Sequence, residues 1–258
     1  MLTRIFLSSI LALLFPYEFS LATDVQSGTG RIAKSPPGEM MLIPAGKGVT
    51  RWGGQIFRKL IFDRPFYVDK FEVTVEEYDK YLSPKGKVQK RDLTPAYFEQ
   101  AELPKHAKYP VVGVTWRQAE LYCKAMGKRL PANVEWMMAA VRKGDETAGP
   151  GGVALFDLDE LGKSQSSMKV EIRKPFHVYD QGLRPVGSFL DDVSTYGVYD
   201  MASSVSEWLD WTDKKHDTRE LIGRFSKSLG PAFHSLTHVE DHGGRFWLGF
   251  RCAKDVPK

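Results

Sequence analysis

The chain has 258 residues, which is enough for one domain with a sizeable core. Hydrophobic residues make up 42% and charged residues 26% of the sequence, values that exclude a disordered or fibrous protein. The net charge is only +4, from 36 basic and 32 acidic side chains without a dense basic run, which excludes the footprint of a nucleic-acid-binding protein.

The first 22 residues have the pattern of a signal peptide. Arg4 precedes an apolar run, residues 5–15, that is too short to cross a bilayer comfortably. Ser20 and Ala22 put small residues where a signal peptidase cleaves. We therefore expect cleavage after Ala22, no membrane span in the mature chain, and a periplasmic or secreted location; the alternative is an uncleaved anchor. Residues 23–37 have no periodicity and are expected to form a linker.

Two strands and a helix are expected next. Residues 39–45 form an apolar run that suits a strand, and residues 65–73 alternate as a half-buried strand does. Thr74 is the expected N-cap of a helix, because Glu77 stands at the capping-box position. The apolar face of this helix consists of Tyr78, Tyr81 and Leu82.

Residues 115–127 predict a second helix with clear ends. Thr115 and Gln118 form another capping box. An apolar ladder at helical spacing follows, consisting of Ala119, Tyr122, Cys123 and Met126. Gly127 comes directly after the ladder, where a left-handed C-cap needs a residue without a Cβ.

A turn and a third helix are predicted after Gly127. Leu130-Pro131 forces extended backbone. The Arg129 guanidinium in this turn is expected to bind backbone carbonyls or a buried carboxylate, a structural role. Asn133 is the expected N-cap of the helix that carries Trp136, Met137, Ala139 and Ala140.

Two more motifs lie in the C-terminal half, beyond residues 143–180. The first is Tyr196-Gly197-Val198-Tyr199-Asp200-Met201 with Glu207-Trp208 after it. The second is Gly249-Phe250-Arg251-Cys252-Ala253. The cysteines Cys123 and Cys252 are the only two in the chain, and in an exported protein such a pair indicates one disulfide. Two buried thiols are the alternative.

The order of these motifs resembles the formylglycine-generating enzyme (sulfatase-modifying factor) domain over residues 38–256. Residues 143–180 lack the family's usual turn and metal-binding loop and are expected to be a divergent surface insertion. The resemblance implies an irregular α+β fold related to C-type lectins, with few helices, small antiparallel sheets and much coil. It also implies that Cys123 and Cys252 form a structural disulfide.

The resemblance also implies where catalytic chemistry belongs. Aerobic enzymes of the family bind copper(I) through two cysteine thiolates shortly before the Gly-Phe-Arg motif, and the metal activates oxygen to oxidise a substrate cysteine. Residues 221–244 of this chain contain no cysteine. Ser226 and Ser228 lie there, but a hydroxyl is neither a soft ligand nor a redox thiol. Copper at a cysteine site is therefore not expected, and whether the chain is an enzyme stays open.

Three histidines in the same segment are a weaker candidate for catalysis. His234, His238 and His242 stand four residues apart, and on a helix they would share one face able to bind copper or zinc. Glycines and a proline flank the run, which favours a loop. The alternative to a metal site is a solvated or hydrogen-bonded histidine cluster.

Structural calcium is the second candidate. The resemblance implies a cation held by the side chains of Asp200 and Glu207 and by backbone oxygens of Ser203 and Val205. Ser203-Ser204 replaces the family's usual Gly-Asn, which alters the loop. The alternative has Glu207 hydrogen-bonded to backbone and Asp200 capping a turn.

Three functions remain open. The first is an exported non-catalytic or accessory domain that binds an envelope or secreted protein or peptide, without nucleic acid. The second is an enzyme of altered chemistry in the oxidative maturation of a secreted peptide or metabolite. The third is a carbohydrate-binding module, which rests on fold analogy alone.

Overall fold

The computed structural model describes residues 39–52, 55–141, 146–147, 153–157, 177–180, 182–213, 218–222, 239–240 and 245–257. The signal peptide and linker expected at residues 1–37 lie outside these ranges. The helices are α1 Val75–Leu82, α2 Lys87–Leu93, α3 Trp116–Ala125 and α4 Asn133–Ala139, with 3₁₀ turns η1 Phe98–Gln100 and η2 Val178–Asp180. The strands are β1 Met40–Ile43, β2 Gly46–Trp52, β3 Gln55–Phe62, β4 Phe66–Asp69, β5 Glu146–Thr147, β6 Val153–Asp157, β7 Ser206–Asp213, β8 Thr218–Ile222, β9 Val239–Glu240, β10 Leu248–Gly249 and β11 Ala253–Asp255.

A three-stranded antiparallel sheet joins the two ends of the domain. Its order is β1-β4-β11, so the C-terminal strand pairs with β4, which lies near the start of the domain. Val68 faces both Met41 of β1 and Ala253 of β11. Phe66 and Val68 of this central strand are buried in the core, while Tyr67 between them is half exposed. One face of β4 therefore packs against the core.

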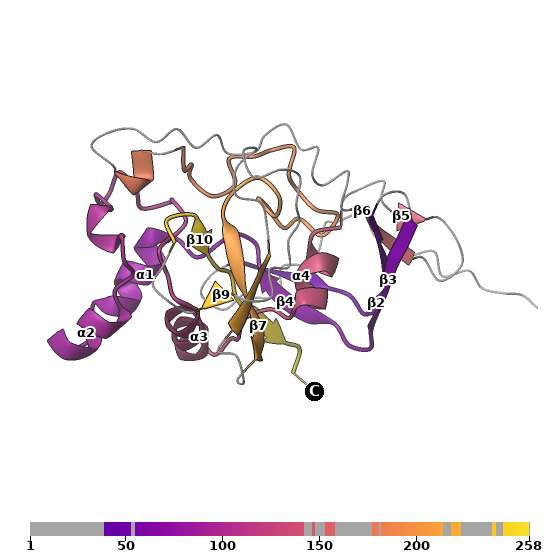
Figure 1. Ribbon diagram of the computed structural model, residues 1–258, viewed down its shortest axis with the longest axis horizontal. Helices are drawn as coiled ribbons and strands as arrows, with labels where there is room; N and C mark the ends of the chain where they lie inside the picture. The colour runs from indigo at the N-terminus through magenta and orange to yellow at the C-terminus, as the bar shows by residue number, and fades with distance from the viewer. Residues whose placement is uncertain are drawn as a thin grey trace, which may run out of the picture.

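The other two sheets have four strands each, in the orders β10-β7-β8-β9 and β3-β2-β6-β5. Most pairs are antiparallel, but β2 pairs with β6 and β7 pairs with β10 in parallel. The sheet containing β2 and β3 lies at the right of the molecule, and α1, α2 and α3 lie at the left (Figure 1). The expected insertion at residues 143–180 contributes β5 and β6 to this right-hand sheet.

Helices α1 and α3 begin at the expected residues. The Thr74 hydroxyl accepts the N–H of Glu77, whose carboxylate accepts the N–H of Thr74 at 2.9 Å. Thr115 and Gln118 repeat this arrangement at the start of α3. Reciprocal capping satisfies N–H groups that have no partner inside the helix, which fixes both starts.

The end of α3 and the start of α4 fix the turn between them. Gly127 has a φ of +67°, and the N–H of Lys128 donates to the Cys123 carbonyl at 2.8 Å, a Schellman motif. The expected cap at Asn133 is wrong by one residue, since the N-cap of α4 is Ala132. The Glu135 carboxylate accepts the Ala132 N–H at 2.8 Å, so Glu135 caps the helix without a side-chain acceptor at the cap itself.

A dense aromatic core surrounds the disulfide. Tyr78 stacks on Tyr122 with ring centroids 5.4 Å apart, and Phe250 meets Tyr122 edge-on at 5.3 Å. Trp116, Trp136 and Trp208 are buried as core tryptophans, as their apolar surroundings in the sequence suggest. Within the described ranges, no helix has both the length and the apolar character needed to cross a membrane.

Candidate functional site

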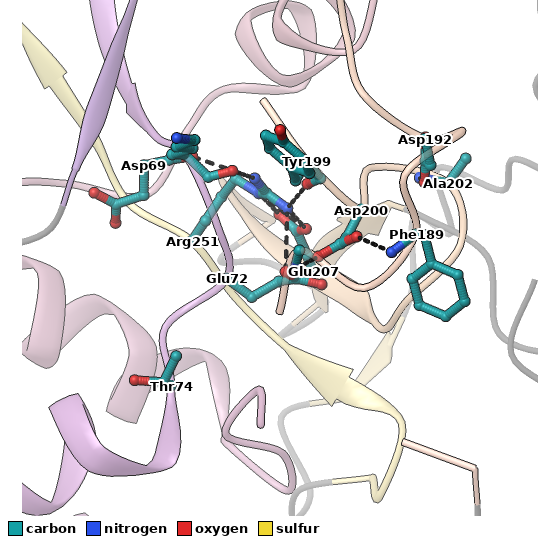
Figure 2. A network of polar contacts seen from close by, with 12 residues as sticks. Asp69, Glu72, Thr74, Phe189, Asp192, Tyr199, Asp200, Ala202, Glu207 and Arg251 are labelled. Carbon is teal, nitrogen blue, oxygen red and sulfur yellow. Dashed lines mark hydrogen bonds and ion pairs between the residues drawn. The ribbon is translucent and has the colours of Figure 1, made fainter. Parts of the chain in front are cut away.

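Arg251 is the centre of a buried polar network (Figure 2). It lies between β10 and β11, and its Nε donates to both oxygens of Glu207, at 3.0 and 2.8 Å. Its Nη atoms donate to backbone carbonyls at 3.0 to 3.3 Å; these belong to Tyr199, Asp69 and Lys70. The guanidinium thereby holds together segments that are far apart in sequence. It can do so because the arginine side chain is long and ends in a planar group with five N–H donors.

Steric crowding explains why a glycine, Gly249, stands two positions before Arg251. A Cβ on Gly249 would lie 2.9 Å from the carbonyl oxygen of Val111 and 3.0 Å from a methyl group of Val205. Neither atom is the free end of a flexible side chain. The Gly-Phe-Arg motif therefore lets β10 pack closely enough to place Arg251 in the core.

Glu207 connects the same network to α4. It lies on β7 and is fully buried. Besides its bonds to Arg251, its Oε2 accepts the indole N–H of Trp136 at 2.8 Å. Both oxygens are thus engaged by charged or N–H donors, which offsets the cost of burying a carboxylate.

Glu72 is a second buried carboxylate beside Arg251. Its Oε2 lies 3.7 Å from Arg251 Nη2. Burial and the neighbouring Asp200 carboxylate raise the pKa of Glu72 well above its ordinary value, and the Arg251 charge and a hydrogen bond with the Ser204 side chain only partly oppose this. Glu72, Asp200 and Glu207 thus set three carboxyl groups around one guanidinium.

Asp200 shapes the loop before β7. It has a φ of +63°, a conformation that Asp tolerates better than most side chains. Its carboxylate accepts the N–H groups of Gly187 and of Phe189, the latter at 3.3 Å. Burial raises the pKa of Asp200 to about 6, and the Gly187 hydrogen bond opposes the shift. The carboxylate of Asp192 supports the same loop by accepting the Ala202 N–H at 2.7 Å.

Two residues of the calcium hypothesis, Asp200 and Glu207, lie near each other in the buried network (Figure 2). Ser203 and Val205, between them in sequence, are also buried. Both carboxylates have protein donors, so a calcium ion would share oxygens already in use. Three carboxyl groups around one guanidinium leave an excess of negative charge, which a bound cation would balance. A proton on Glu72 would also remove part of this excess. Calcium therefore stays a prediction.

The disulfide lies beside a buried ion pair. Cys123 of α3 and Cys252 are bonded, with Cα atoms 5.7 Å apart, which is the pairing that the resemblance implied. The Asp69 carboxylate accepts the Cys252 N–H at 2.9 Å and pairs with Lys128 Nζ at 2.6 Å. Both side chains are almost fully buried. The end of α3 is therefore attached to β4 and to the C-terminal segment by both covalent and ionic bonds.

Arg129 fulfils the structural role expected of it. Its guanidinium makes a bidentate pair with Glu135 at 2.6 and 2.7 Å and also contacts Asp255. The backbone of Arg129 exchanges two hydrogen bonds with Ala253. The Arg-Leu-Pro turn is thereby fastened to β11.

A family model decides the identity of this scaffold. The model of the sulfatase-modifying factor enzyme 1-like domain matches residues 26–256. The chain belongs to the sulfatase-modifying factor enzyme 1-like domain family. The capped helices, the Gly-Phe-Arg arginine and the disulfide described above are thus features of a family member, and the expected irregular α+β fold is confirmed.

Relatives of this sulfatase-modifying-factor-like chain differ widely in their names. A serine/threonine-protein kinase pkn1 of Chlamydia caviae is 32% identical over 76% of this chain and 34% of its own length. Inactive C-alpha-formylglycine-generating enzyme 2 of Mus musculus is 26% identical over 93% of this chain and 83% of its own. The chain thus spans about a third of the length of the kinase that it matches.

A solved structure has the same fold. PvdO from Pseudomonas aeruginosa superposes with a TM-score of 0.56 at 22% identity, over 85% of this chain and 95% of that one. At this identity the similarity shows the fold alone.

The copper and histidine hypotheses both stay predictions. Both cysteines of the chain are consumed by the disulfide, so no thiol remains to bind copper(I). Ser226, Ser228, His234, His238 and His242 all lie outside the described residues, and the histidine hypothesis stays a prediction. Within the described ranges, no cluster of His, Cys, Asp and Glu has the arrangement of a metal site.

Two members of the buried network were not foreseen from the sequence. Glu72 stands between Phe71 and Val73, and Arg251 stands between Phe250 and Cys252. A single charge inside an apolar run is a signal of a buried ion pair. That signal marks each residue but does not identify its partner, because Glu207 lies 44 positions before Arg251.

Proposed function

We propose that this chain is an exported, non-catalytic member of its family that binds a protein or peptide partner. The observation that carries this proposal is the use of both cysteines in the Cys123–Cys252 disulfide. Copper(I) chemistry in the family needs a pair of soft thiolates, and disulfide sulfurs do not supply them. The helices, the central sheet and the disulfide of the scaffold are present in the described residues, while the sequence offers no free cysteine pair for the oxidation chemistry.

The relatives support the same proposal. The mouse relative carries the word inactive in its name and matches nearly the whole chain. In the Chlamydia kinase the matching segment is about a third of a longer protein. A domain that recurs as part of other proteins and also in an inactive relative suits a binding role.

Export is part of the proposal. The apolar run at residues 5–15 and the small residues before position 23 predict a cleaved signal peptide. A disulfide persists in the oxidising compartments that lie beyond the inner membrane or outside the cell. N-terminal sequencing of the exported protein should begin at Thr23; a mature chain that still begins at Met1 contradicts the proposal.

Cross-linking tests the binding role. The mature protein, carrying a photo-cross-linker on the exposed surface, is added to an envelope fraction, and cross-linked proteins are identified by mass spectrometry. We expect one dominant polypeptide whose capture is abolished by an excess of unlabelled protein. Uncompetable capture of many proteins, or turnover of an added cysteine peptide, would count against a binding domain.

Structural calcium is proposed alongside the binding role. The residues that would hold the ion are Asp200 and Glu207, with backbone oxygens of Ser203 and Val205. Calcium would supply charge balance in the buried network and no step of a reaction. The melting temperature should rise with calcium and fall with a chelator; a melting temperature unmoved by either sinks this part of the proposal.

The enzymatic alternative depends on His234, His238 and His242. They account for three of the six histidines in the chain within nine positions. Transition-metal content is compared between the natural protein and the variant with all three changed to Ala. Metal bound only by the natural protein would favour altered chemistry; equal content in both would remove the alternative.

A further inference from the structure

Helix α2, Lys87–Leu93, has none of its side chains buried. Each of α1, α3 and α4 buries an apolar face, whereas α2 contributes only the partly buried Leu93 to the core. The Val88 side chain is 70% exposed, and the Arg91 side chain is 81% exposed. Figure 1 shows α2 at the left end of the molecule, directed away from the sheets.

The C-terminal end of α2 is firmly attached to the core. The Tyr78 hydroxyl donates to the Leu93 carbonyl at 2.9 Å. The Gln118 side-chain amide donates to the carbonyls of Asp92 and Thr94, both at 3.1 Å. Tyr78 and Gln118 are themselves buried and belong to α1 and α3. The helix is therefore a solvent-exposed element held in a fixed position.

One face of α2 carries three positive charges. Lys87, Lys90 and Arg91 follow the spacing i, i+3, i+4, which places them on the same side of a helix. Like charges at these spacings destabilise a helix. The only acidic residue in α2 is Asp92, whose carboxylate lies 3.4 Å from Arg91 Nε in an exposed pair. Lys90 and Arg91 in the last turn suit the helix dipole, whereas Lys87 at the start of the helix does not.

Cations on the neighbouring helices are neutralised. Lys80 of α1 pairs with Glu76 at 2.8 Å. On α3, Glu120 pairs at 2.6 Å with both Arg117 and Lys124. Over the ranges that the structure describes, by contrast, no carboxylate lies within 4 Å of Lys87 or Lys90. The charges of Lys87 and Lys90 are thus available to a partner, and the exposed pair of Arg91 with Asp92 leaves the Arg91 guanidinium open to solvent.

We propose that Lys87, Lys90 and Arg91 of α2 dock an acidic segment of the polypeptide that this domain binds. This inference rests on the proposed function and adds the surface and the chemistry of the partner. A rigid row of cations attracts carboxylates with little loss of conformational freedom in the helix backbone. A membrane surface fits less well, because an interfacial helix needs an apolar face, whereas α2 exposes only Val88 and its Leu93 packs against the core.

A binding assay with a defined probe tests the proposal. The probe is a fluorescent twelve-residue peptide of alternating Glu and Ser, and its anisotropy is measured with the full mature protein. The variant Lys87→Glu, Lys90→Glu, Arg91→Glu should bind it at least about tenfold more weakly, since three favourable charge pairs become repulsive. Binding by the natural protein should weaken as salt is raised.

A charge-matched variant is the control. Lys47→Glu, Arg64→Glu, Lys254→Glu changes the net charge equally and leaves α2 intact. It should bind within about twofold of the natural protein if the site is local rather than a net-charge effect. Both variants should melt near the natural protein, because none of the six side chains is buried. Equal weakening by the two variants, or tight binding to phosphatidylglycerol vesicles in place of the peptide, would overturn the proposal.

Repeating the cross-linking with the α2 variant separates this inference from the proposed function. Loss of the partner in the α2 variant, with capture retained by the control variant, supports α2 as the docking surface. Equal capture by the natural protein and the α2 variant overturns the role of α2 and leaves the binding function in place.

Discussion

Arg251 and Glu207 form an ion pair in a place where water cannot reach either charge. Burying both ions costs desolvation energy, which is recovered only when each N–H and oxygen finds a partner. Arg251 meets this condition through Glu207 and the backbone carbonyls around it. The pair therefore matters less for its net stabilisation than for the damage done when one partner is removed.

Replacing Arg251 with Met should destabilise the domain by about 3–5 kcal/mol, because Glu207 would be left as an uncompensated buried charge. Urea unfolding followed by tryptophan fluorescence measures the loss. The double variant Arg251→Met, Glu207→Gln should recover part of it, since the orphaned charge is gone. A double variant as unstable as the sum of the two single variants would contradict this account of the network.

His106 is a buried histidine packed against the rings of Tyr109 and Tyr179. Its Nδ1 accepts the N–H of Glu102 at 3.0 Å, and its ring stacks on Tyr179 with centroids 5.0 Å apart. Burial lowers the pKa of His106, as does the charge of Lys105, while the carboxylates of Glu102 and Asp180 oppose the shift. The second imidazole nearby, His177, is 5.9 Å away.

The lowered pKa predicts a pH dependence of stability. A histidine whose pKa is lower in the folded state stabilises the fold above the unfolded value of about 6.5, and this contribution is lost as the pH falls through the folded value. The unfolding free energy should therefore drop below about pH 6.5 more steeply in the natural protein than in His106→Asn, whose amide oxygen can still accept the Glu102 N–H. Parallel pH profiles for the two proteins would show that the pKa of His106 is the same in the folded and unfolded states.

Helix ends are the features that the sequence predicted best. Thr74 with Glu77 and Thr115 with Gln118 form the two expected capping boxes, and Gly127 takes the expected left-handed conformation. These signals are local, involving residues three or four positions apart. The predicted cap of α4 is wrong because Asn133 is a residue type that often caps helices. In the structure the Glu135 carboxylate, in the first turn of the helix, accepts the Ala132 N–H instead.

Substitutions at two glycines with positive φ, Gly127 and Gly113, distinguish the cost of backbone strain from the cost of steric overlap. At Gly127 an added Cβ would meet nothing within 4 Å, whereas at Gly113 it would lie 2.7 Å from the Tyr97 ring and 3.2 Å from the Tyr97 backbone nitrogen. Gly127→Ala should cost only the left-handed conformation, about 1–2 kcal/mol. Gly113→Ala should cost about 2–5 kcal/mol because overpacking is added. Equal shifts of the urea midpoint would refute the distinction.

The shorter elements could not have been predicted in the same way. Helix α2 has no apolar periodicity, and the strands β5 and β6 come from a Gly- and Ser-rich stretch. Their positions depend on partners elsewhere in the chain, such as Gln118 for α2 and β2 for β6. The same reason explains why the sequence did not identify Glu72 and Arg251 as members of one buried network.

Over the whole molecule, long-range bonds take the place of long regular elements. The Cys123–Cys252 disulfide, the Lys128–Asp69 ion pair and the Arg129 contacts with Asp255 all fasten the α3–α4 turn to the strands around the C-terminus. Both cysteines of the chain are part of this framework. A family scaffold without a free thiol is the basis for proposing a binding role.

Oxidation of a cysteine peptide tests this account most directly. The mature protein is incubated with copper(I), oxygen and a peptide carrying the sulfatase cysteine motif, and the peptide is analysed by mass spectrometry. A formylglycine-generating enzyme that keeps its cysteine pair serves as the positive control, and copper without protein serves as the blank. We expect no formylglycine above the blank, because this chain has no thiolate pair to hold the metal. Catalytic formation of formylglycine by this protein would contradict the proposal of a non-catalytic domain.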